Sequence, residues 1–141
     1  MSFFALASPL DLFRKLEGDL AALHESPSDS RVAFNFFVTA EHLPDWLGKR
    51  GLVTNHPLLR VVSHLANGAK HFTLDPKRHA SVIGTTEESY AENYVDPGYV
   101  EDWLLVHLSA AEAAALGRNV IDVRELGKVV LDFWRPHVPG A

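Results

Sequence analysis

The hydrophobic positions of residues 57–72 recur with the period of an α-helix. Apolar side chains return every three or four residues, which places them on one face of a helix with about 3.6 residues per turn. These residues are Leu58, Val62, Leu65, Ala69 and Phe72. Polar side chains return with the same spacing on another face, and they are Arg60, His64, Asn67 and His71. The pattern predicts an amphipathic helix over residues 57–72, with Pro57 in its first turn.

Two more helices are predicted on the N-terminal side of this one. A capping hydroxyl and a first-turn proline, Ser8-Pro9, precede leucines at helical spacing, so we expect a helix over residues 9–25. Residues 29–49 are apolar nearly all round, which is typical of a helix at the buried centre of a fold. Pro44 removes a hydrogen bond inside that helix, but the apolar spacing continues past it, so a kink is expected there.

The second half of the chain has the pattern of β-strands before it returns to helical spacing. The predicted elements are a strand over residues 79–86, a loop over 87–95, an antiparallel partner strand over 99–108, a short helix over 110–116 and a last helix over 123–136. Asp96-Pro97-Gly98 predicts a turn, because proline and glycine favour the central positions of β-turns. Asp122 is the expected N-cap of the last helix, and residues 51–56 are expected to form a loop.

These elements predict a single α+β domain over residues 1–141. We expect a helical bundle built on an antiparallel helix hairpin, residues 29–72, which is covered by the first helix, a small antiparallel β-hairpin and a C-terminal helix. A chain of 141 residues is the size of one ordinary domain. Its hydrophobic content of 47% and its charged content of 22% are typical of a globular protein.

Composition and charge exclude several classes of protein. The chain has no cysteine, so disulfides and thiolate metal sites are excluded. No apolar run approaches the roughly 18–20 residues of a membrane-spanning helix, and segment 1–8 lacks the basic start of a secretory signal. We therefore expect a cytoplasmic protein without a membrane partner. The net charge of -5 argues against a protein that coats DNA or RNA, because phosphate binding needs clustered Lys and Arg.

A second polar stripe lies on the predicted helix 29–49. If the two helices fold back antiparallel about residue 53, this stripe lies level with the polar stripe of helix 57–72. In this arrangement the residues at the same height along the two helices are Asn35 and His71, Thr39 and Asn67, His42 and His64, and Trp46 and Arg60. The apolar stripes align equally well, so the sequence leaves open which pair of stripes faces inward. Adjoining polar stripes would form a groove, here called the polar seam, which is either a site, a hydrogen-bonded structural network or a solvated surface.

One kind of chemistry that suits the polar seam is metal-independent cleavage of RNA. His71 would act as a general base, because imidazole titrates near neutral pH. Arg60 or Lys70 would stabilise the charge of the phosphate. The ribose 2′-hydroxyl would be the nucleophile, so the reaction needs no cofactor.

Two other interpretations of the seam stay open. A divalent metal could be bound by imidazole and carboxylate groups, and the residues available for it are His42, His64, Glu41 and Asp45. Alternatively, the helix hairpin has no catalytic role and pairs with a second copy of the chain, which makes the protein a dimeric interaction module.

Residues 66–71, Ala-Asn-Gly-Ala-Lys-His, resemble the signature of the HEPN helical domains, which reads Arg, a polar residue, any three residues and His. Asn67 and His71 match the polar and His positions, and the Arg position holds Ala66. HEPN domains are helical and commonly dimeric, and many are metal-independent ribonucleases with Arg and His in a composite site across the dimer. The resemblance therefore implies an RNA-related homodimer, which is either a ribonuclease that uses His71 and Asn67 or a catalytically lapsed relative.

The chain also looks like a group of uncharacterised bacterial proteins with the layout F-N-F-x-V-T-A…H…D-W followed by A-N-G-A-K-H-F. Here the layout runs from Phe34 to Trp46 and from Ala66 to Phe72. This second resemblance implies a bacterial protein and no particular activity.

Overall fold

The computed structural model describes residues 3–70, 81–91 and 100–141. Its elements in chain order are α1 (Pro9–Glu25), α2 (Ser30–Trp46), α3 (Gly51–Asn55), α4 (Pro57–Lys70), β1 (Val82–Ala91), β2 (Val100–Leu108), α5 (Ala110–Leu116), β3 (Val120–Asp122), α6 (Val123–Trp134) and the 3-10 turn η1 (Arg135–His137). The described residues confirm the predicted α+β class, with a helix hairpin, a small antiparallel sheet and a C-terminal helix.

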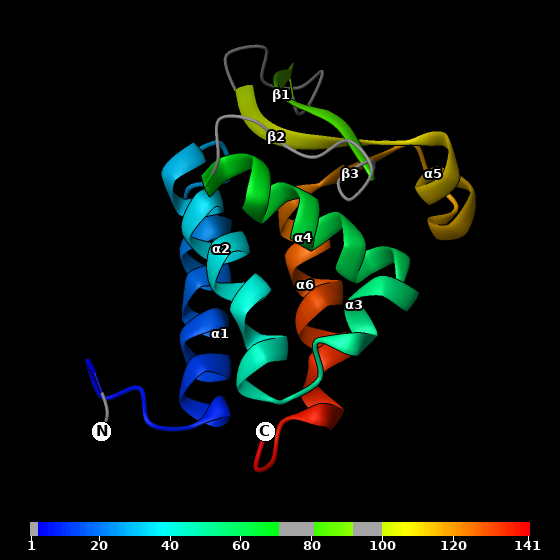
Figure 1. Ribbon diagram of the computed structural model, residues 1–141. Helices are drawn as coiled ribbons and strands as arrows, with labels where there is room; N and C mark the ends of the chain where they lie inside the picture. The colour runs from blue at the N-terminus through cyan, green and yellow to red at the C-terminus, as the bar shows by residue number, and fades with distance from the viewer. Residues whose placement is uncertain (1–2, 71–80, 92–99) are drawn as a thin grey trace.

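The helices form a bundle, and the sheet covers one end of it (Figure 1). α2 packs against both α1 and α4, while α6 packs against α1, α2 and the sheet. α5 contacts α4 and β2 at the side of the molecule. Both ends of the chain lie at the end of the bundle opposite the sheet (Figure 1). The space between α2, α4 and the sheet is therefore enclosed by segments from both halves of the chain.

The core is filled by side chains from four helices, α1, α2, α4 and α6, and from the central strand. The largest fully buried side chains include Trp134, Phe13, Phe36, Leu16, Leu23, Leu43, Leu126, Val61 and Val106. Gly127 allows α6 to approach α1 and α2 closely, because a Cβ atom at this position would lie 2.7 Å from Leu20 Cδ1. Burial of these apolar side chains is the main force that holds the bundle together.

The starts of the helices follow local capping rules. The Ser8 hydroxyl accepts a hydrogen bond from the backbone N–H of Asp11 at 3.2 Å, and Pro9 begins α1. The Asp122 carboxylate accepts a hydrogen bond from the backbone N–H of Arg124 at 2.7 Å at the start of α6. Both predicted caps are confirmed, and each satisfies a backbone donor that the helix itself leaves unpaired.

The first turn of α1 makes a pH-dependent contribution to stability. The Asp11 carboxylate accepts a hydrogen bond from the backbone N–H of Ala7 at 2.9 Å. This bond and the contact with the Ser8 side chain lower the pKa of Asp11 below its ordinary value. Because the pKa is lower in the folded state than in the unfolded state, the stabilisation is present at neutral pH. It is lost as the pH falls through the folded-state pKa.

We expect an NMR pH titration of the folded protein to show a lowered pKa for the Asp11 carboxyl. Asp11→Asn should also reduce the loss of stability that acidification causes, measured as the free energy of unfolding at a series of pH values. An ordinary pKa at Asp11, or an acid dependence unchanged in the variant, would contradict this assignment.

The sheet is antiparallel, in the order β1-β2-β3. Val106 of the central strand pairs with Thr85 of β1 on one side and with Ile121 of β3 on the other. The register of β1 shifts between Val82 and Gly84, as at a β-bulge. The predicted pairing of the two long strands is confirmed, and it places one end of β1 next to α4.

Two predicted boundaries in the helix hairpin are wrong. α2 continues through Pro44 as expected but ends at Trp46, not at residue 49. Gly48 has a φ of 67°, a left-handed backbone conformation that favours glycine and stops the helix. Residues 51–55 form the short helix α3 instead of a loop, because this single turn packs against α4.

The predictions for the sheet are also incomplete. β1 runs to Ala91, whereas the pattern predicts a loop from residue 87. Its polar residues are held in strand conformation by backbone pairing with β2, such as Glu87 opposite Leu104. β3 has three residues, which is too short to show a period in the sequence. The predicted turn at residues 96–98 lies outside the described residues.

Candidate functional site

Two residues of the polar stripe of α2, Asn35 and Thr39, face α1. The Lys15 ammonium group lies 2.6 Å from Asp19 Oδ2, 3.1 Å from Thr39 Oγ1 and 3.3 Å from Asn35 Oδ1. Asn35 completes this network by donating from Nδ2 to Asp19 Oδ1 at 3.0 Å. Asn35 and Thr39 are therefore satisfied by α1 and do not join α4 in a polar seam. Within the described residues, the two polar stripes face different neighbours.

The carboxylates of α2 in the metal hypothesis are paired with an arginine. Arg50 places Nη1 2.5 Å from Glu41 Oε1 and Nη2 2.6 Å from Asp45 Oδ2. These contacts raise the pKa of Arg50, chiefly through the hydrogen bond with Asp45. The Ser63 hydroxyl of α4 also donates to Glu41 Oε1, at 3.2 Å. Glu41 thus ties α2 to α4, and its carboxylate is already held by Arg50 and Ser63.

The two histidines of the metal hypothesis lie in different surroundings. His42 is exposed on α2, whereas His64 Nδ1 accepts hydrogen bonds from the backbone N–H groups of Ser81 and Val82, both at 3.1 Å. In the part of the chain that the structure describes, no three His, Asp or Glu side chains are grouped so that they could hold a metal ion. The structure therefore does not bring the proposed metal ligands together.

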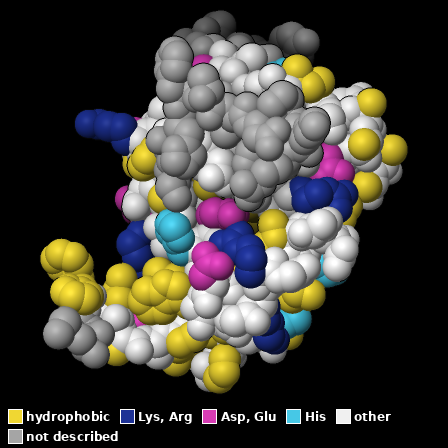
Figure 2. Space-filling view, in the orientation of Figure 1, with side chains coloured by type: hydrophobic (Ala, Val, Ile, Leu, Met, Phe, Trp, Pro, Cys, Tyr) yellow, Lys and Arg dark blue, Asp and Glu magenta, His cyan; other side chains and the backbone are white. Residues whose placement is uncertain are grey.

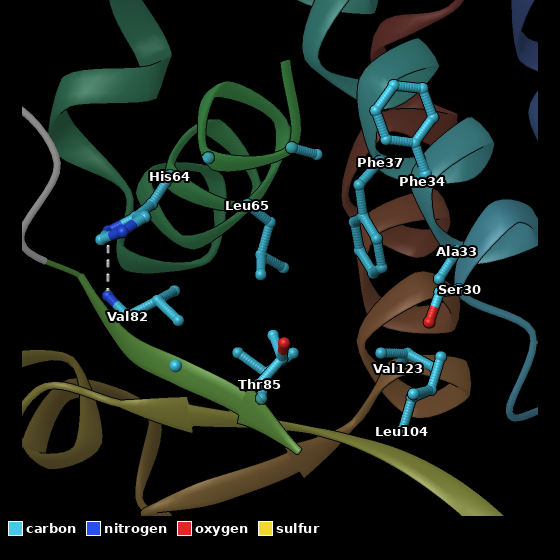
Figure 3. A pocket seen from close by; sticks show the side chains of 14 residues that line it. Ser30, Ala33, Phe34, Phe37, His64, Leu65, Val82, Thr85, Leu104 and Val123 are labelled. Carbon is cyan, nitrogen blue, oxygen red and sulfur yellow. Dashed lines mark hydrogen bonds between the residues drawn. The ribbon is translucent and has the colours of Figure 1, made fainter. Parts of the chain in front are cut away.

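His64 connects α4 to the start of β1. The lone pair of Nδ1 is directed at the two backbone N–H groups at the start of β1. The imidazole is therefore a structural clamp between a helix and a strand. It also borders the open space between them (Figure 3).

Arg60, a predicted catalytic residue, is held in an ion pair with α5. Its Nε lies 3.0 Å from Glu112 Oε2 and its Nη2 lies 2.7 Å from Glu112 Oε1, which is a bidentate contact. Nη1 donates to the backbone carbonyl of Thr54 at 2.8 Å. The hydrogen bonds with Glu112 raise the pKa of Arg60. The Arg60 guanidinium thus makes hydrogen bonds that join α4 to α3 and α5.

The residues of the HEPN-like motif are only partly described. Asn67 donates from Nδ2 to the backbone carbonyl of Ser63, one turn earlier in α4, at 2.8 Å. Ala66, at the Arg position of the signature, is 0% exposed and faces the core. Lys70 is the last residue of α4, but its side chain, like His71, lies outside the described residues. The predicted role of His71 is therefore untested and stays a prediction.

A cavity of about 410 Å³ lies between α2, α4 and the sheet (Figure 3). Its floor is made of buried apolar side chains, which are Ala33, Phe37, Leu104, Val106 and Val123. Leu65 points into it from α4, and Val82 lies near His64 at one end (Figure 3). The cavity thus draws its walls from a helix hairpin, a β-hairpin and the first residue of α6.

The rim of the cavity is open to solvent. It is formed by exposed residues, which are Ser30, Phe34, Gly68, Ala69 and Thr85. The exposure of Phe34 shows that α2, expected to be buried nearly all round, has an open side here. Gly68 and Ala69 have little or no side chain, so the end of α4 does not fill the space.

The described residues that line the cavity carry no net charge. None of them is Lys, Arg, Asp or Glu, and the polar side chains among them are Ser30, His64 and Thr85. The sequence does not predict this site because each contributing segment, taken alone, has the pattern of an ordinary core element. The signal that sequence analysis could have used is the run of small residues at the end of an otherwise amphipathic helix.

The molecular surface shown in Figure 2 carries acidic and basic side chains close together. Hydrophobic side chains gather at the lower left of that view, where the N-terminal segment lies, and Phe3 and Phe4 are both exposed. Within residues 3–70, 81–91 and 100–141, none of the helices combines the length and the hydropathy that a membrane span needs. The surface in this view thus mixes both signs of charge and does not resemble the clustered basic surface of a nucleic-acid binder.

Comparison of the chain with protein-family models, with curated proteins and with solved structures finds no match in any of the three. The resemblance of residues 66–71 to the HEPN signature therefore stays a prediction. A function can be inferred only from the geometry of the described residues.

Proposed function

We propose that this domain is a binding module that takes an uncharged, apolar small molecule in the cavity between α2, α4 and the sheet. The observation that supports this proposal is the cavity itself, which has an apolar floor and an open rim. Apolar pockets with a few polar groups at their edge are the usual form of small-molecule sites.

The size of the cavity favours a small molecule over a peptide or a helix. Its volume is about 410 Å³. A cavity of roughly 150 Å³ holds one benzene molecule, so by proportion this one holds about 16 non-hydrogen atoms. A ligand of that size would displace water from apolar walls, and this displacement is the main source of affinity.

The charge of the walls favours a neutral ligand. A charged group moved from water into the cavity would lose hydration, and none of the lining residues that the structure describes offers an opposite charge. Arg50 and Arg60 are each held by carboxylates elsewhere and do not offer a free positive charge to an anion. The ligand should therefore bind through its apolar body.

Fewer observations support the RNA-related predictions. Arg60 is occupied by Glu112, and the net charge of -5 does not favour polyanions. RNA cleavage by His71 and pairing with a second copy are still predictions, and neither is needed for the cavity to bind a ligand.

The test is the fluorescence of N-phenylnaphthylamine, an uncharged probe that brightens in apolar surroundings. We expect the wild-type protein to bind it saturably and Ala69→Trp to weaken binding at least tenfold. The reason is steric: Ala69 lies at the exposed rim, so an indole there covers the cavity without entering the core.

The matched control is Ala22→Trp, which adds the same indole to an exposed position of α1. This control should bind the probe as the wild type does. The proposal fails if the wild type does not bind the probe, or if the two tryptophan variants bind it equally well.

A further inference from the structure

Two hydroxyl groups stand on opposite sides of the cavity rim. Ser30 belongs to the first turn of α2, and Thr85 belongs to β1, where it pairs with Val106. Figure 3 shows the Ser30 oxygen just above Val123, whereas Thr85 lies across the cavity, below Leu65. Helix and strand thus present a polar atom each at the entrance of an otherwise apolar cavity.

Neither hydroxyl has a structural task among the described residues. The cap of α2 is Asp29, whose carboxylate accepts hydrogen bonds from Arg31 N–H at 2.9 Å and from Val32 N–H at 3.4 Å. Ser30 is therefore not the capping residue. Thr85 is exposed on β1, and the side-chain hydrogen bond of that part of the strand is made by its neighbour, Thr86, with His107. Both hydroxyls are free to exchange bound water for a ligand.

We infer that the ligand is a neutral amphiphile whose apolar body lies on the cavity floor and whose hydroxyl or carbonyl oxygen meets Ser30 or Thr85 at the rim. This inference rests on the proposed function and specifies the ligand class. A hydroxyl group both donates and accepts, so Ser and Thr can satisfy an alcohol, a ketone or an amide oxygen. A pure hydrocarbon would leave both hydroxyls without a partner at the place where it displaces their water.

A carboxylate or an amine does not fit this entrance. The charged residues next to Ser30 are Asp29 and Arg31, and they pair with each other at 3.5 Å. Their charges cancel, so they give no preference for either sign. Because Ser30 and Thr85 are neutral, a charged head group would exchange full hydration for two weak partners.

The test compares octanol, octane and octanoate as competitors of N-phenylnaphthylamine, at a pH where octanoate is ionised. The variants are Ser30→Ala and Thr85→Val, which remove the hydroxyls and keep the shape of the side chains. We expect at least one of the two variants to weaken octanol binding about three- to tenfold, the usual effect of one lost hydrogen bond. Octane has no polar atom, so its binding should fall less than that of octanol in the variants, and octanoate should bind the wild type more weakly than octanol.

The outcomes separate this inference from the proposed function. If the probe binds and Ala69→Trp blocks it, but Ser30→Ala and Thr85→Val hold octanol as the wild type does, the ligand class is wrong and the binding function stands. Octanoate binding more tightly than octanol would also overturn the ligand class. Thermal melts of both variants should match the wild type, because neither side chain is buried. If the wild type does not bind the probe, both proposals fail.

Discussion

Replacing Trp134 with alanine should lower the free energy of unfolding by about 3–5 kcal/mol, the usual cost of removing a large aromatic side chain from a core. Trp134 is 1% exposed on α6. Its ring meets the Phe133 ring edge to face, with ring centroids 5.0 Å apart, and lies 5.6 Å from the His137 ring. Few neighbours can move to fill the space, because the packing of a protein core is close to that of a crystal.

The control for this prediction is the same substitution at an exposed tryptophan. Trp46 is 42% exposed at the end of α2, so Trp46→Ala should cost less than about 1 kcal/mol. Both values can be measured by urea unfolding followed by circular dichroism, and Trp134→Phe provides a milder variant if Trp134→Ala does not fold. Equal losses at the two tryptophans would contradict the placement of α6 in the core.

Replacing Glu112 with alanine should lower the free energy of unfolding by about 1–3 kcal/mol. The Glu112 side chain is 5% exposed, and its two carboxylate oxygens accept hydrogen bonds from Arg60. Without the Glu112 carboxylate, the Arg60 guanidinium loses its ion-pair partner. Because the Arg60 side chain is partly exposed, water would offset a share of the loss, which keeps the cost below that of a fully buried ion pair.

Glu125→Ala is the control for this second prediction. Glu125 pairs with Arg118 at 2.6 Å, but the pair lies on the surface, so its loss should change stability by less than about 1 kcal/mol. If Glu112→Ala were as mild as Glu125→Ala, Arg60 would not be the structural tie between α4 and α5, and its predicted catalytic role would regain weight.

The helices were predictable because their signals are local. Helical spacing of apolar residues and caps such as Ser8 and Asp122 depend on neighbours within one or two turns. The orientation of each helix about its axis is not local. Asn35 turned out to face Lys15 of α1 because a charged partner on that helix lies within reach, and no pattern within α2 alone contains that information.

The short elements were missed for a related reason. α3 and β3 have too few residues to show a period, and they form because larger elements pack against them or pair with them. The polar end of β1 lacks the alternation of a half-buried strand, yet the backbone of β2 holds it in register. Tertiary contacts override weak local preferences in each case.

The cavity could not be predicted because it is a property of what the packed elements leave unfilled. Its floor takes Phe37 from α2, Leu104 from β2 and Val123 from α6, residues that are far apart in the sequence. Each has the hydrophobic character of a core residue. Only their arrangement in space, with the small residues Gly68 and Ala69 opposite, produces an open apolar site.

The most direct test of this site is a methyl NMR spectrum of the wild-type protein with and without N-phenylnaphthylamine. We expect chemical-shift changes and NOEs to the probe at the methyl groups of Leu65, Val82, Leu104 and Val123, which line the cavity. Ile83 and Val120 are exposed and lie outside it, so their methyl groups should not respond. NOEs confined to those exposed methyl groups, with no response from the cavity, would contradict a ligand-binding role for the space between α2, α4 and the sheet.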